Sequence, residues 1–502
     1  MKLKKLLKDL PLKVFKGPKD IDITGVCANS KLVAPGNLFI AKKGRSEDGA
    51  RYIPEAVAAG ASAILTDIYD PSYKHIAQLI YPDVASLEGL VAASYYNFPS
   101  DELFMVGITG TNGKTTSTFL VKHLLDQING PCGLIGTIEY ILGKNRYQAT
   151  RTTPDVTSNH KMLREMLLQG CRSAAMEVTS HALDQKRVQN IDFDVAIFTN
   201  LTLDHLDYHQ TMEQYAQAKN TLFRTLDPMK VKKVKTPPRT AVVNIDSCWH
   251  EKILEGCKAP LLTYGIMSPA DITASNIELS FQGTQFDLTY KGKKVLCRLP
   301  LIGRFNVYNS LVMAAVGIVQ GIALQDIAEI MSTAPSVPGR LQAAPNALNL
   351  KIYVDFAHSD DALLNVLECL QELKKGRIIT VFGCGGDRDR GKRAKMAGAA
   401  EELSDISIVT SDNPRSEDPE SIAKEVTRGF KKTTSYLIEV DRRMAIRKAI
   451  EMAHAEDIIL IAGKGHETYQ IFAHKTVEFD DLKVAVEICQ EMAHQKRDLA
   501  LT

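Results

Sequence analysis

Hydrophobic residues recur along this chain of 502 residues in two alternating patterns. Short apolar runs such as Leu103-Phe-Met-Val-Gly-Ile108 are bounded by Gly, Pro or polar residues, and amphipathic helical stretches lie between them. Buried parallel strands joined by crossover helices produce this alternation. The pattern therefore predicts an α/β protein with parallel sheets from about residue 101 to the end of the chain.

Three segments change this picture. Between Asp271 and Pro300 polar and apolar residues alternate with a period of two, which predicts a small antiparallel β ribbon. Residues 1–100 mix short apolar runs with the helix-like Ile53–Ala61, and the basic stretch Lys2–Lys16 predicts an amphipathic helix. We expect three domains, at residues 1–100, 101–335 and 336–502, with a P-loop-type sheet in the second and a Rossmann-like α/β fold in the third.

The composition excludes several classes of protein. The hydrophobic content of 45% and charged content of 24% are ordinary for a globular protein. With 61 basic and 59 acidic residues the net charge is +2, which provides no global field to recruit nucleic acid. The nine cysteines include no CxxC pair, which argues against a zinc site and is typical of a reducing cytoplasm. No apolar stretch approaches the ~18 residues of a membrane span, so we expect a cytoplasmic protein without membrane insertion.

The stretch Gly107-Ile-Thr-Gly-Thr-Asn-Gly-Lys-Thr-Thr116 follows an apolar run and precedes a helical segment. A strand that ends in a Gly-rich turn and opens a helix is a phosphate cradle, because backbone N–H groups and the helix N-terminus face one anion. Lys114 adds a positive charge, and the Thr115 hydroxyl suits Mg²⁺. The spacing departs from the usual P-loop because Ile108 stands where a glycine is expected. We therefore predict a nucleotide-binding loop of an unusual subtype.

Polar motifs follow other predicted strands of the same block. Ser173-Ala-Ala-Met-Glu177 ends in a carboxylate, and Asp194–Thr199 is followed by Asn200-Leu-Thr-Leu-Asp-His205. In open parallel sheets, ligands bind beyond the carboxyl ends of the strands. We therefore expect Glu177 and His205 to lie near the phosphate loop as Mg²⁺ ligands.

Lys219 occupies an unusual position in a predicted helix. Residues 215, 219, 222 and 223 of this segment share one helical face, and the other three are Tyr, Leu and Phe. A core-facing ammonium is rarely tolerated without a partner. Lys219 is therefore either a snorkelling or ion-paired lysine, or a desolvated amine that is modified to a metal-binding carbamate.

These motifs together resemble the Mur ligase family, and the resemblance covers essentially the whole chain in one order. Besides the phosphate loop, it includes Glu177-Val-Thr-Ser-His181, Asn200-Leu-Thr-Leu-Asp-His205 and Tyr215-Ala-Gln-Ala-Lys219. It continues with the motifs Gly303-Arg-Phe-Asn-Val-Tyr-Asn309, Pro338-Gly-Arg340 and Val354-Asp-Phe-Ala-His358.

The resemblance implies an ATP-dependent amide ligase of peptidoglycan synthesis that works through an acyl phosphate. The implied substrates are UDP-MurNAc-L-Ala-D-Glu and meso-diaminopimelate, the implied cofactors are ATP and Mg²⁺, and the expected state is a monomer. Lys114, His205 and Lys219 would be catalytic, with Lys219 as N6-carboxylysine. Thr115, Glu177, His205 and Lys219 would hold Mg²⁺. ATP would contact Thr109, Gly110, Thr111, Asn112, Gly113, Lys114, Thr115, Thr116, Asn306, Asn309, Arg340 and Asp355.

The resemblance also implies two further groups of substrate contacts. The UDP-MurNAc-peptide would contact Ser30, Thr152, Thr153, Thr179, Gln185 and Arg187. The family commonly shows Asp-Ser-Arg around the serine, whereas this chain reads Asn29-Ser30-Lys31, and lysine lacks the bidentate fork of arginine. Meso-diaminopimelate would contact Arg388, Asp412, Asn413, Pro414, Arg415, Gly463 and Glu467.

Arg415 is the residue on which the predicted amino-acid specificity depends. Arginine binds a carboxylate bidentately, and in the family the tetrapeptide Asp412-Asn-Pro-Arg415 marks members that add meso-diaminopimelate. Two related alternatives are a lysine-adding member and a folylpolyglutamate-synthetase-like ligase. An alternative of a different class is a P-loop NTPase switch, which would give no role to Lys219.

Overall fold

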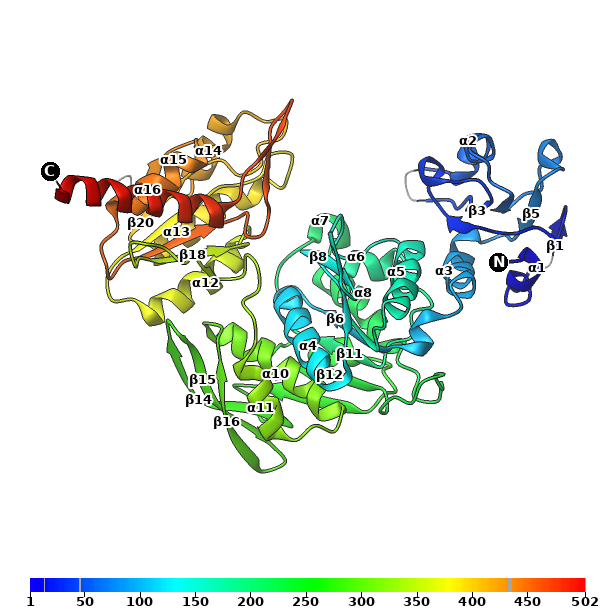
Figure 1. Cartoon of the computed structure of the whole chain (residues 1–502), viewed down its shortest axis with the longest axis horizontal. Helices are drawn as coiled ribbons and strands as arrows, with labels where there is room; N and C mark the ends of the chain where they lie inside the picture. Colours follow the sequence, from blue (N-terminus) through cyan, green and yellow to red (C-terminus); the bar gives the residue numbers. More distant parts are fainter. Residues whose placement is uncertain (13, 45–46, 432–435, 502) are drawn as a thin grey trace. The chain divides into compact units, whose positions relative to one another are not determined.

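The structure is a computed structural model, and it describes residues 1–12, 14–44, 47–431 and 436–501 (Figure 1). The chain forms two compact units. The first comprises Met1–Leu201, His205–Thr263 and Ala315–Gly321, and the second comprises Thr202–Asp204, Tyr264–Ala314 and Ile322–Thr502.

The first unit begins with a five-stranded sheet in the order β1-β5-β4-β3-β2. All neighbouring strands are parallel except β1, which pairs antiparallel with β5. The strands are Val14–Lys16 (β1), Gly25–Cys27 (β2), Asn37–Ile40 (β3), Ala63–Thr66 (β4) and Ala77–Ile80 (β5). The helices are Leu3–Leu6 (α1), Ile53–Ala58 (α2) and Val84–Tyr95 (α3).

The helix predicted over Lys2–Lys16 is wrong. Among the residues of this stretch that the structure describes, the four of α1 are the only helical ones, and the chain enters the sheet at β1. Leu3 and Leu6 are fully buried, so these two leucines hold a single turn against the core. Pro11 lies between the helical turn and the strand, and a proline cannot continue the hydrogen-bonding ladder of a helix.

The phosphate loop lies on an eleven-stranded sheet, in which the strands that belong wholly to the first unit have the order β12-β11-β6-β10-β7-β8-β9. The strands from β12 to β7 in this order are parallel to one another, and the pairs β7–β8 and β8–β9 are antiparallel. The strands are Phe104–Thr109 (β6), Cys132–Ile135 (β7), Glu139–Leu142 (β8), Asn145–Gln148 (β9), Ser173–Glu177 (β10), Val195–Phe198 (β11) and Thr240–Asn244 (β12). Every residue of β6, β10 and β11 is buried, as a strand covered on both faces requires.

The helices of this region connect the strands and carry several candidate residues. They are Lys114–Asn129 (α4), Val156–Leu168 (α5), Ser180–Asp184 (α6), Leu206–His209 (α7), Met212–Arg224 (α8) and His250–Leu254 (α9). Helix α8 has the predicted buried face, since Tyr215, Lys219, Leu222 and Phe223 are all buried. The boundary between the two units falls within Leu261–Gly265 (β13).

The second unit contains the predicted antiparallel ribbon. Its strands are Ile272–Ser280 (β14), Gly283–Tyr290 (β15) and Lys293–Leu299 (β16), and both pairings are antiparallel. Two helices follow, Arg304–Val319 (α10) and Leu324–Ser332 (α11), and α11 packs against β16. The period-two alternation therefore predicted this element correctly.

The C-terminal sheet has the order β17-β18-β22-β19-β20-β21 and is parallel except for β17. Its strands are Gln342–Ala343 (β17), Lys351–Asp355 (β18), Ile378–Phe382 (β19), Ile406–Val409 (β20), Tyr436–Ile438 (β21) and Ile458–Ala462 (β22). A hairpin of Tyr469–Ile471 (β23) and Thr476–Glu478 (β24) follows.

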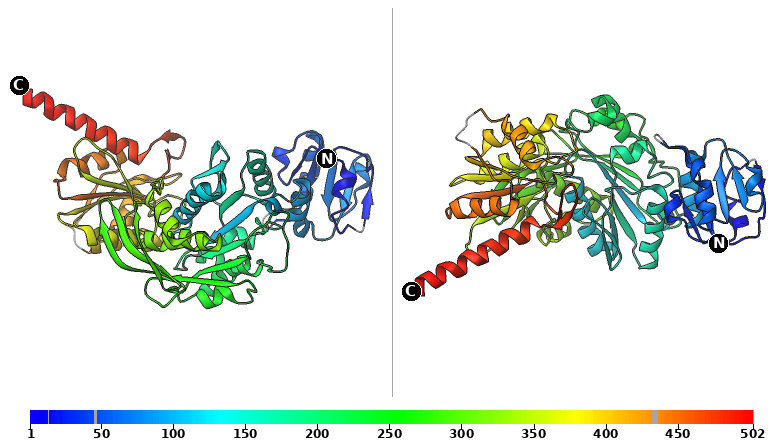
Figure 2. Two further views of the ribbon diagram at one scale, coloured as in Figure 1. Left: turned by 60° about the horizontal axis from the view of Figure 1, so that its bottom comes forward. Right: turned by 90° about the horizontal axis from the view of Figure 1, so that it is seen from above.

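Two apolar cores cover the faces of this sheet. One includes residues of Asp360–Leu373 (α12), Gly391–Leu403 (α13) and Pro419–Thr427 (α14), and the other includes residues of Arg442–Met452 (α15) and Asp481–Leu501 (α16). Helix α16 continues beyond the sheet in both views of Figure 2. The α/β fold class predicted from the sequence is confirmed. Within the described ranges, no helix has the length and apolar character that a membrane crossing needs.

Candidate active site

The phosphate loop joins β6 to α4 and has the backbone that its glycines predict. Gly113 has φ 83° and immediately precedes the first residue of α4. A Cβ atom on Gly110 would lie 1.9 Å from Thr199 Oγ1, so only glycine fits there. Lys114 Nζ donates to the carbonyls of Gly110 at 2.9 Å and Thr111 at 2.8 Å, so the lysine folds back over the loop. The N-terminus of α4 and the ammonium thus form a cradle that fits the phosphates of a nucleotide.

Glu177 lies beside the loop because β10 pairs with β6, with Glu177 opposite Ile108. The carboxylate is fully buried, and Thr115 Oγ1 donates to its Oε2 atom at 3.0 Å. A hydroxyl and a carboxylate in contact at the foot of a phosphate loop are the oxygen ligands that Mg²⁺ prefers. The two residues predicted to bind Mg²⁺ at this end of the loop therefore lie together, and their chemistry fits that ion.

Thr137 also contacts Glu177, and the sequence analysis did not identify it. Its backbone N–H donates to Oε1 at 2.8 Å and its hydroxyl to Oε2 at 3.0 Å. The residue before it, Gly136, leaves room for the carboxylate, since a Cβ there would lie 2.5 Å from Glu177 Oε1. Thr137 follows β7, which is the neighbour of β10, so its position after a strand was the signal that could have identified it.

Lys219 is 1% exposed and lies beneath the phosphate loop. Its Nζ atom donates to the Gly110 carbonyl at 2.8 Å and lies 4.5 Å from the centre of the Tyr215 ring. The snorkelling alternative is therefore wrong, because the ammonium is buried rather than in solvent. The amine lies at the loop that Lys114 also contacts, since both ammonium groups donate to the Gly110 carbonyl.

His205 belongs to a cluster of rings beside α8. It has φ 56° and precedes α7, and its ring centre lies 4.8 Å from that of His181 and 6.0 Å from that of Tyr215. The Tyr215 hydroxyl also lies 3.2 Å from that of Thr111, and the Lys219 ammonium lies over the face of the Tyr215 ring. The buried Tyr215 thus joins His205, Lys219 and the phosphate loop, a role that the sequence analysis did not assign to it.

Within the described ranges, no group of three or more His, Cys, Asp and Glu side chains is placed to hold a metal ion. The predicted set of Thr115, Glu177, His205 and Lys219 contains only two residues of those types.

The predicted contacts of the muramoyl-peptide form one hydrogen-bonded network around the end of β10. Thr153 Oγ1 donates to the Glu177 carbonyl at 2.8 Å, and the backbone N–H of Thr179 donates to Thr153 Oγ1 at 3.1 Å. Arg187 donates to the Thr153 carbonyl at 3.0 Å and to Gln185 Oε1 at 2.6 Å. The Thr152 hydroxyl lies 3.1 Å from that of Thr137. Five of the six predicted residues are therefore linked to the Glu177 site.

The sixth residue, Ser30, is buried at the start of a short 3-10 helix, Ser30–Leu32. Asn29 caps this turn, because its side chain accepts the backbone N–H of Lys31 at 3.1 Å. Asparagine and aspartate cap helices equally well. The substitution of the family's aspartate by Asn29 therefore preserves the local backbone around Ser30.

The second unit holds the remaining predicted ATP contacts. Asn306 and Asn309 are buried on α10, and Asn309 Nδ2 donates to Asn306 Oδ1 at 3.0 Å. Asp355 ends β18 and accepts the backbone N–H groups of Leu341 at 2.6 Å and Ala357 at 2.7 Å. Burial raises the pKa of the Asp355 carboxyl, while the positive charge of Arg340 opposes that shift. Arg340 and Asp355 therefore lie close together, as the sequence analysis predicted for a nucleotide contact.

The predicted amino-acid contacts lie at the carboxyl ends of three adjacent strands, β22, β19 and β20. Glu467 Oε2 accepts Asn413 Nδ2 at 2.8 Å, and a Cβ on Gly463 would lie 2.9 Å from Asp412 Oδ2. Gly385 lies against both arginines, since a Cβ there would be 2.9 Å from Arg415 Nη1 and 3.5 Å from Arg388 Cγ. Pro414 is buried in the same turn.

Lys464 supports this arrangement and was not identified from the sequence. It is fully buried, and its ammonium donates to Asn413 Oδ1 at 3.3 Å, Glu467 Oε2 at 3.0 Å and the Tyr469 carbonyl at 2.5 Å. Three acceptors match the three N–H groups of an ammonium. Lys464 therefore ties the turn after β22 to the turn after β20.

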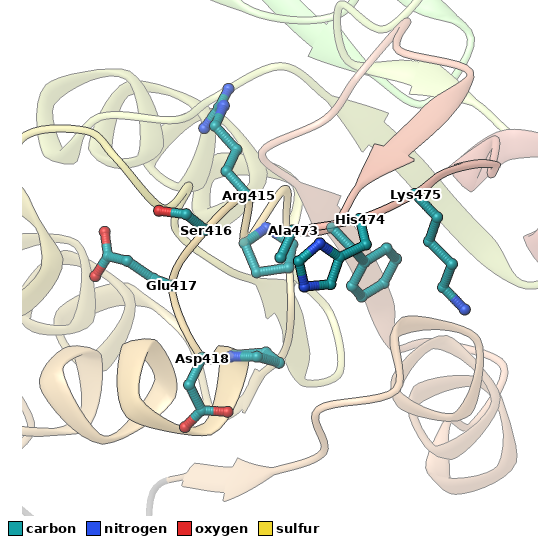
Figure 3. Close-up of a pocket in the computed structure, with 10 residues that line it drawn as sticks. Arg415, Ser416, Glu417, Asp418, Ala473, His474 and Lys475 are labelled. Carbon is teal, nitrogen blue, oxygen red and sulfur yellow. The ribbon is translucent and has the colours of Figure 1, made fainter.

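A pocket of about 390 Å³ lies between the Arg415 turn and the β23–β24 hairpin (Figure 3). It is lined by residues 414–419 and by 472–475 of the β23–β24 hairpin. In Figure 3 the side chains of Arg415 and Glu417 point away from His474 and Lys475 of this hairpin. The Arg415 guanidinium therefore faces the loop after β19 rather than the pocket.

Comparisons with known proteins agree over most of the chain. Three family descriptions match: the catalytic domain of the Mur ligase family at residues 22–92, the Mur ligase middle domain at 108–317 and the Mur ligase glutamate ligase domain at 339–465. A UDP-N-acetylmuramoyl-L-alanyl-D-glutamate--2,6-diaminopimelate ligase of Chlamydia caviae is 44% identical over 493 residues, which is 97% of this chain and 99% of the relative. The protein of the same name from Caldanaerobacter subterraneus is 39% identical over 492 residues, or 98% and 99% of the two chains.

Solved structures give the same result. A structure of a UDP-N-acetylmuramoyl-L-alanyl-D-glutamate--2,6-diaminopimelate ligase matches with a TM-score of 0.68 and 31% identity, covering 94% of this chain and 96% of that one. MurF ligase from Thermotoga maritima in complex with ADP shares the fold, with a TM-score of 0.64 at 16% identity over 94% and 98% of the two chains. Identity of this extent over nearly the full length shows that the chain belongs to the Mur ligase family.

Proposed function

We propose that this protein is an ATP-dependent ligase that adds meso-diaminopimelate to UDP-N-acetylmuramoyl-L-alanyl-D-glutamate in peptidoglycan synthesis. The relatives named for this activity support the proposal over nearly their full length. The observation that carries the proposal is that Arg388 and Arg415 both lie against Gly385. The Glu467 carboxylate lies at the same edge of the sheet. An amino acid with a second carboxylate and a second ammonium is complementary to such a site.

The proposed reaction has two chemical steps. An oxygen of the D-glutamyl carboxylate forms a bond to the γ-phosphorus of ATP, and the bond from that phosphorus to the ADP oxygen breaks. The amine of diaminopimelate then attacks the acyl carbon, and the tetrahedral intermediate loses a proton and expels phosphate. Lys114 would neutralise charge on the transferring phosphoryl group, and the substrate-side network around Thr153 would orient the carboxylate.

Mg²⁺ would supply charge neutralisation at the phosphates, and Thr115 and Glu177 are the residues proposed to hold it at the loop. His205 and Lys219, as a carbamate, would hold a second ion. Asn309, Arg340 and Asp355 would contact adenine, phosphate and ribose. The protein is proposed to act in the cytoplasm as a monomer, with no membrane or nucleic-acid partner.

The direct test measures phosphate release with UDP-MurNAc-L-Ala-D-Glu, ATP and one of three conditions: meso-diaminopimelate, L-lysine or no amine. We expect kcat/KM to be at least about a hundredfold higher with diaminopimelate, because lysine leaves Arg415 facing no carboxylate. Equal rates with lysine would favour the lysine-adding alternative. Phosphate release that needs no amine would favour a P-loop NTPase switch.

Glu177→Gln is expected to raise the Mg²⁺ concentration needed for half-maximal activity by roughly 10–100-fold, because an amide lacks the charge that holds a divalent ion. A Mg²⁺ titration of phosphate release at saturating substrates measures this. Thr137→Val removes one hydrogen bond to the same carboxylate and should shift the titration in the same direction but less. An unchanged Mg²⁺ dependence in Glu177→Gln would show that this carboxylate holds no ion.

A further inference from the structure

Two turns at the carboxyl edge of the C-terminal sheet are fastened to each other. One follows β19 and includes residues 385–387, and the other follows β20 and includes residues 414–417. The backbone N–H of Asp387 donates to Glu417 Oε1 at 2.7 Å, and the Ser416 hydroxyl donates to Asp387 Oδ1 at 2.7 Å. A Cβ on Gly386 would lie 1.9 Å from the Pro414 carbonyl, so the two backbones are in direct contact.

Arg415 lies within the fastened turn in a strained backbone conformation. Its φ is 53°, in the left-handed region that residues with a Cβ rarely adopt. Such a conformation persists only where the surrounding structure holds it. Within the described part of the chain, both hydrogen bonds of the guanidinium run from Nη1, to the carbonyls of Gly386 at 2.7 Å and Asn413 at 3.4 Å. The rest of the guanidinium fork is thus oriented by this contact with the loop after β19.

The charges that hold the turn come from Arg393 on α13 and from Arg390 just before it, whose Nη2 donates to Glu417 Oε2 at 3.0 Å. Arg393 is 1% exposed and donates through Nη2 to Glu417 Oε1 at 2.8 Å and through Nη1 to Glu417 Oε2 at 3.0 Å. The same Nη2 group donates to the Gly385 carbonyl at 3.3 Å, so Arg393 contacts both turns at once. The hydrogen bonds from Arg393 lower the pKa of the Glu417 carboxyl to about 2, so Glu417 is ionised at neutral pH.

We propose that Glu417, gripped bidentately by Arg393, is a positioning residue for amino-acid specificity: it holds the Arg415 turn against residues 385–387 so that the Arg415 guanidinium meets the distal carboxylate of the incoming amino acid. This inference rests on the proposed function and adds to it the group that sets the geometry of Arg415. Glu417 acts through Arg415 and does not itself contact the amino acid.

Glu425 provides a matched control on the same arginine. Its Oε2 atom accepts a hydrogen bond from Arg393 Nη1 at 2.8 Å. Glu425 also forms an ion pair at 3.6 Å with Arg390, the residue just before α13. Both Glu417→Gln and Glu425→Gln remove one negative charge from beside Arg393. Only Glu417→Gln also changes a group that joins the two turns, so a comparison of the two variants isolates that effect.

The experiment measures the KM values for meso-diaminopimelate and for ATP in the full-length protein, together with the Tm. For Glu417→Gln we expect the diaminopimelate KM to rise roughly tenfold or more, because a small displacement of a binding group has that effect. The ATP KM should change less than about twofold, because none of the predicted ATP contacts belongs to the two fastened turns. Glu425→Gln should leave both KM values near those of the unmodified protein.

Equal rises of both KM values in Glu417→Gln, or the same change in Glu425→Gln, would overturn the proposal. If Glu417→Gln does not fold, Ser416→Ala carries the test, since it removes an exposed contact to Asp387 without neutralising a charge. It should raise the diaminopimelate KM in the same direction, and an unchanged value would overturn the proposal. Failure of the proposed function is recognised separately, because it appears as a lack of diaminopimelate dependence in the unmodified protein.

Discussion

Replacing Lys219 with alanine is expected to abolish amide ligation, with a fall in phosphate release on the order of a thousandfold or more. The buried amine lies 2.8 Å from the Gly110 carbonyl of the phosphate loop, where no solvent could substitute for it. In the proposed form, the neutral amine attacks the carbon of CO₂, an N–C bond forms, and a proton leaves the nitrogen. The resulting carbamate presents two oxygens to a divalent ion, as a carboxylate does.

Lys219→Arg separates charge from carbamate chemistry, because a guanidinium keeps the positive charge and does not form a carbamate at neutral pH. We expect it to be as inactive as Lys219→Ala, whereas Gln214→Ala, at an exposed position of the same helix, should retain full activity. Depleting CO₂ should lower the activity of the protein that has no substitution at Lys219, and added bicarbonate should restore that activity. An active Lys219→Arg variant would show that only a positive charge is needed.

The position of Lys219 shows what periodicity can predict. Four residues at helical spacing predicted one buried face on α8, and all four are buried. Similarly, motifs after apolar runs predicted ligand groups at strand ends, and the pairing of β10 with β6 places Glu177 beside the phosphate loop. The buried face of α8 and the position of Glu177 were predicted correctly, because a local repeat determines which face of an element is buried and the parallel topology brings the strand ends together.

Other features depend on contacts between distant parts of the chain and were not predictable. The basic N-terminal stretch predicted a long helix, but Leu3 and Leu6 pack as a single turn while Val14–Lys16 pairs with β5. Lys464 has an ordinary position in sequence, and only the fold shows that its three acceptors come from the turn after β20, the turn after β22 and the start of β23. Tertiary packing overrides local propensity in both cases.

The left-handed backbone of Arg415 is the feature of this kind with the clearest functional consequence. The sequence predicted a stiff turn and a carboxylate-binding arginine, but not that the arginine itself would have φ 53°. A glycine would adopt that conformation without strain. Arg415 therefore adopts this backbone at a conformational cost, and such strain is commonest at ligand-binding and active sites.

Arg415→Gly and Arg415→Ala are therefore expected to separate backbone strain from binding. Both remove the guanidinium, and both should raise the meso-diaminopimelate KM about a hundredfold, since truncating one partner of a charge pair costs roughly 2–5 kcal/mol. The ATP KM should change less than about threefold. Stability should follow an order opposite to that usual for glycine and alanine, with the glycine variant more stable by about 1 kcal/mol. Steady-state kinetics and denaturant unfolding measure the two effects.

Arg415→Lys completes the set, because it keeps the positive charge and a Cβ while losing the bidentate fork. Its diaminopimelate KM should lie between those of the unmodified protein and the alanine variant, and its stability should match that of the alanine variant more closely than that of the glycine variant. If the ATP and diaminopimelate KM values rose together in all three variants, Arg415 would be a structural residue of the turn and the specificity of the site would have to reside elsewhere. A rise in the diaminopimelate KM without a rise in the ATP KM would mean that Arg415 binds the amino acid. The strained backbone would then serve to place its guanidinium where it can reach a carboxylate.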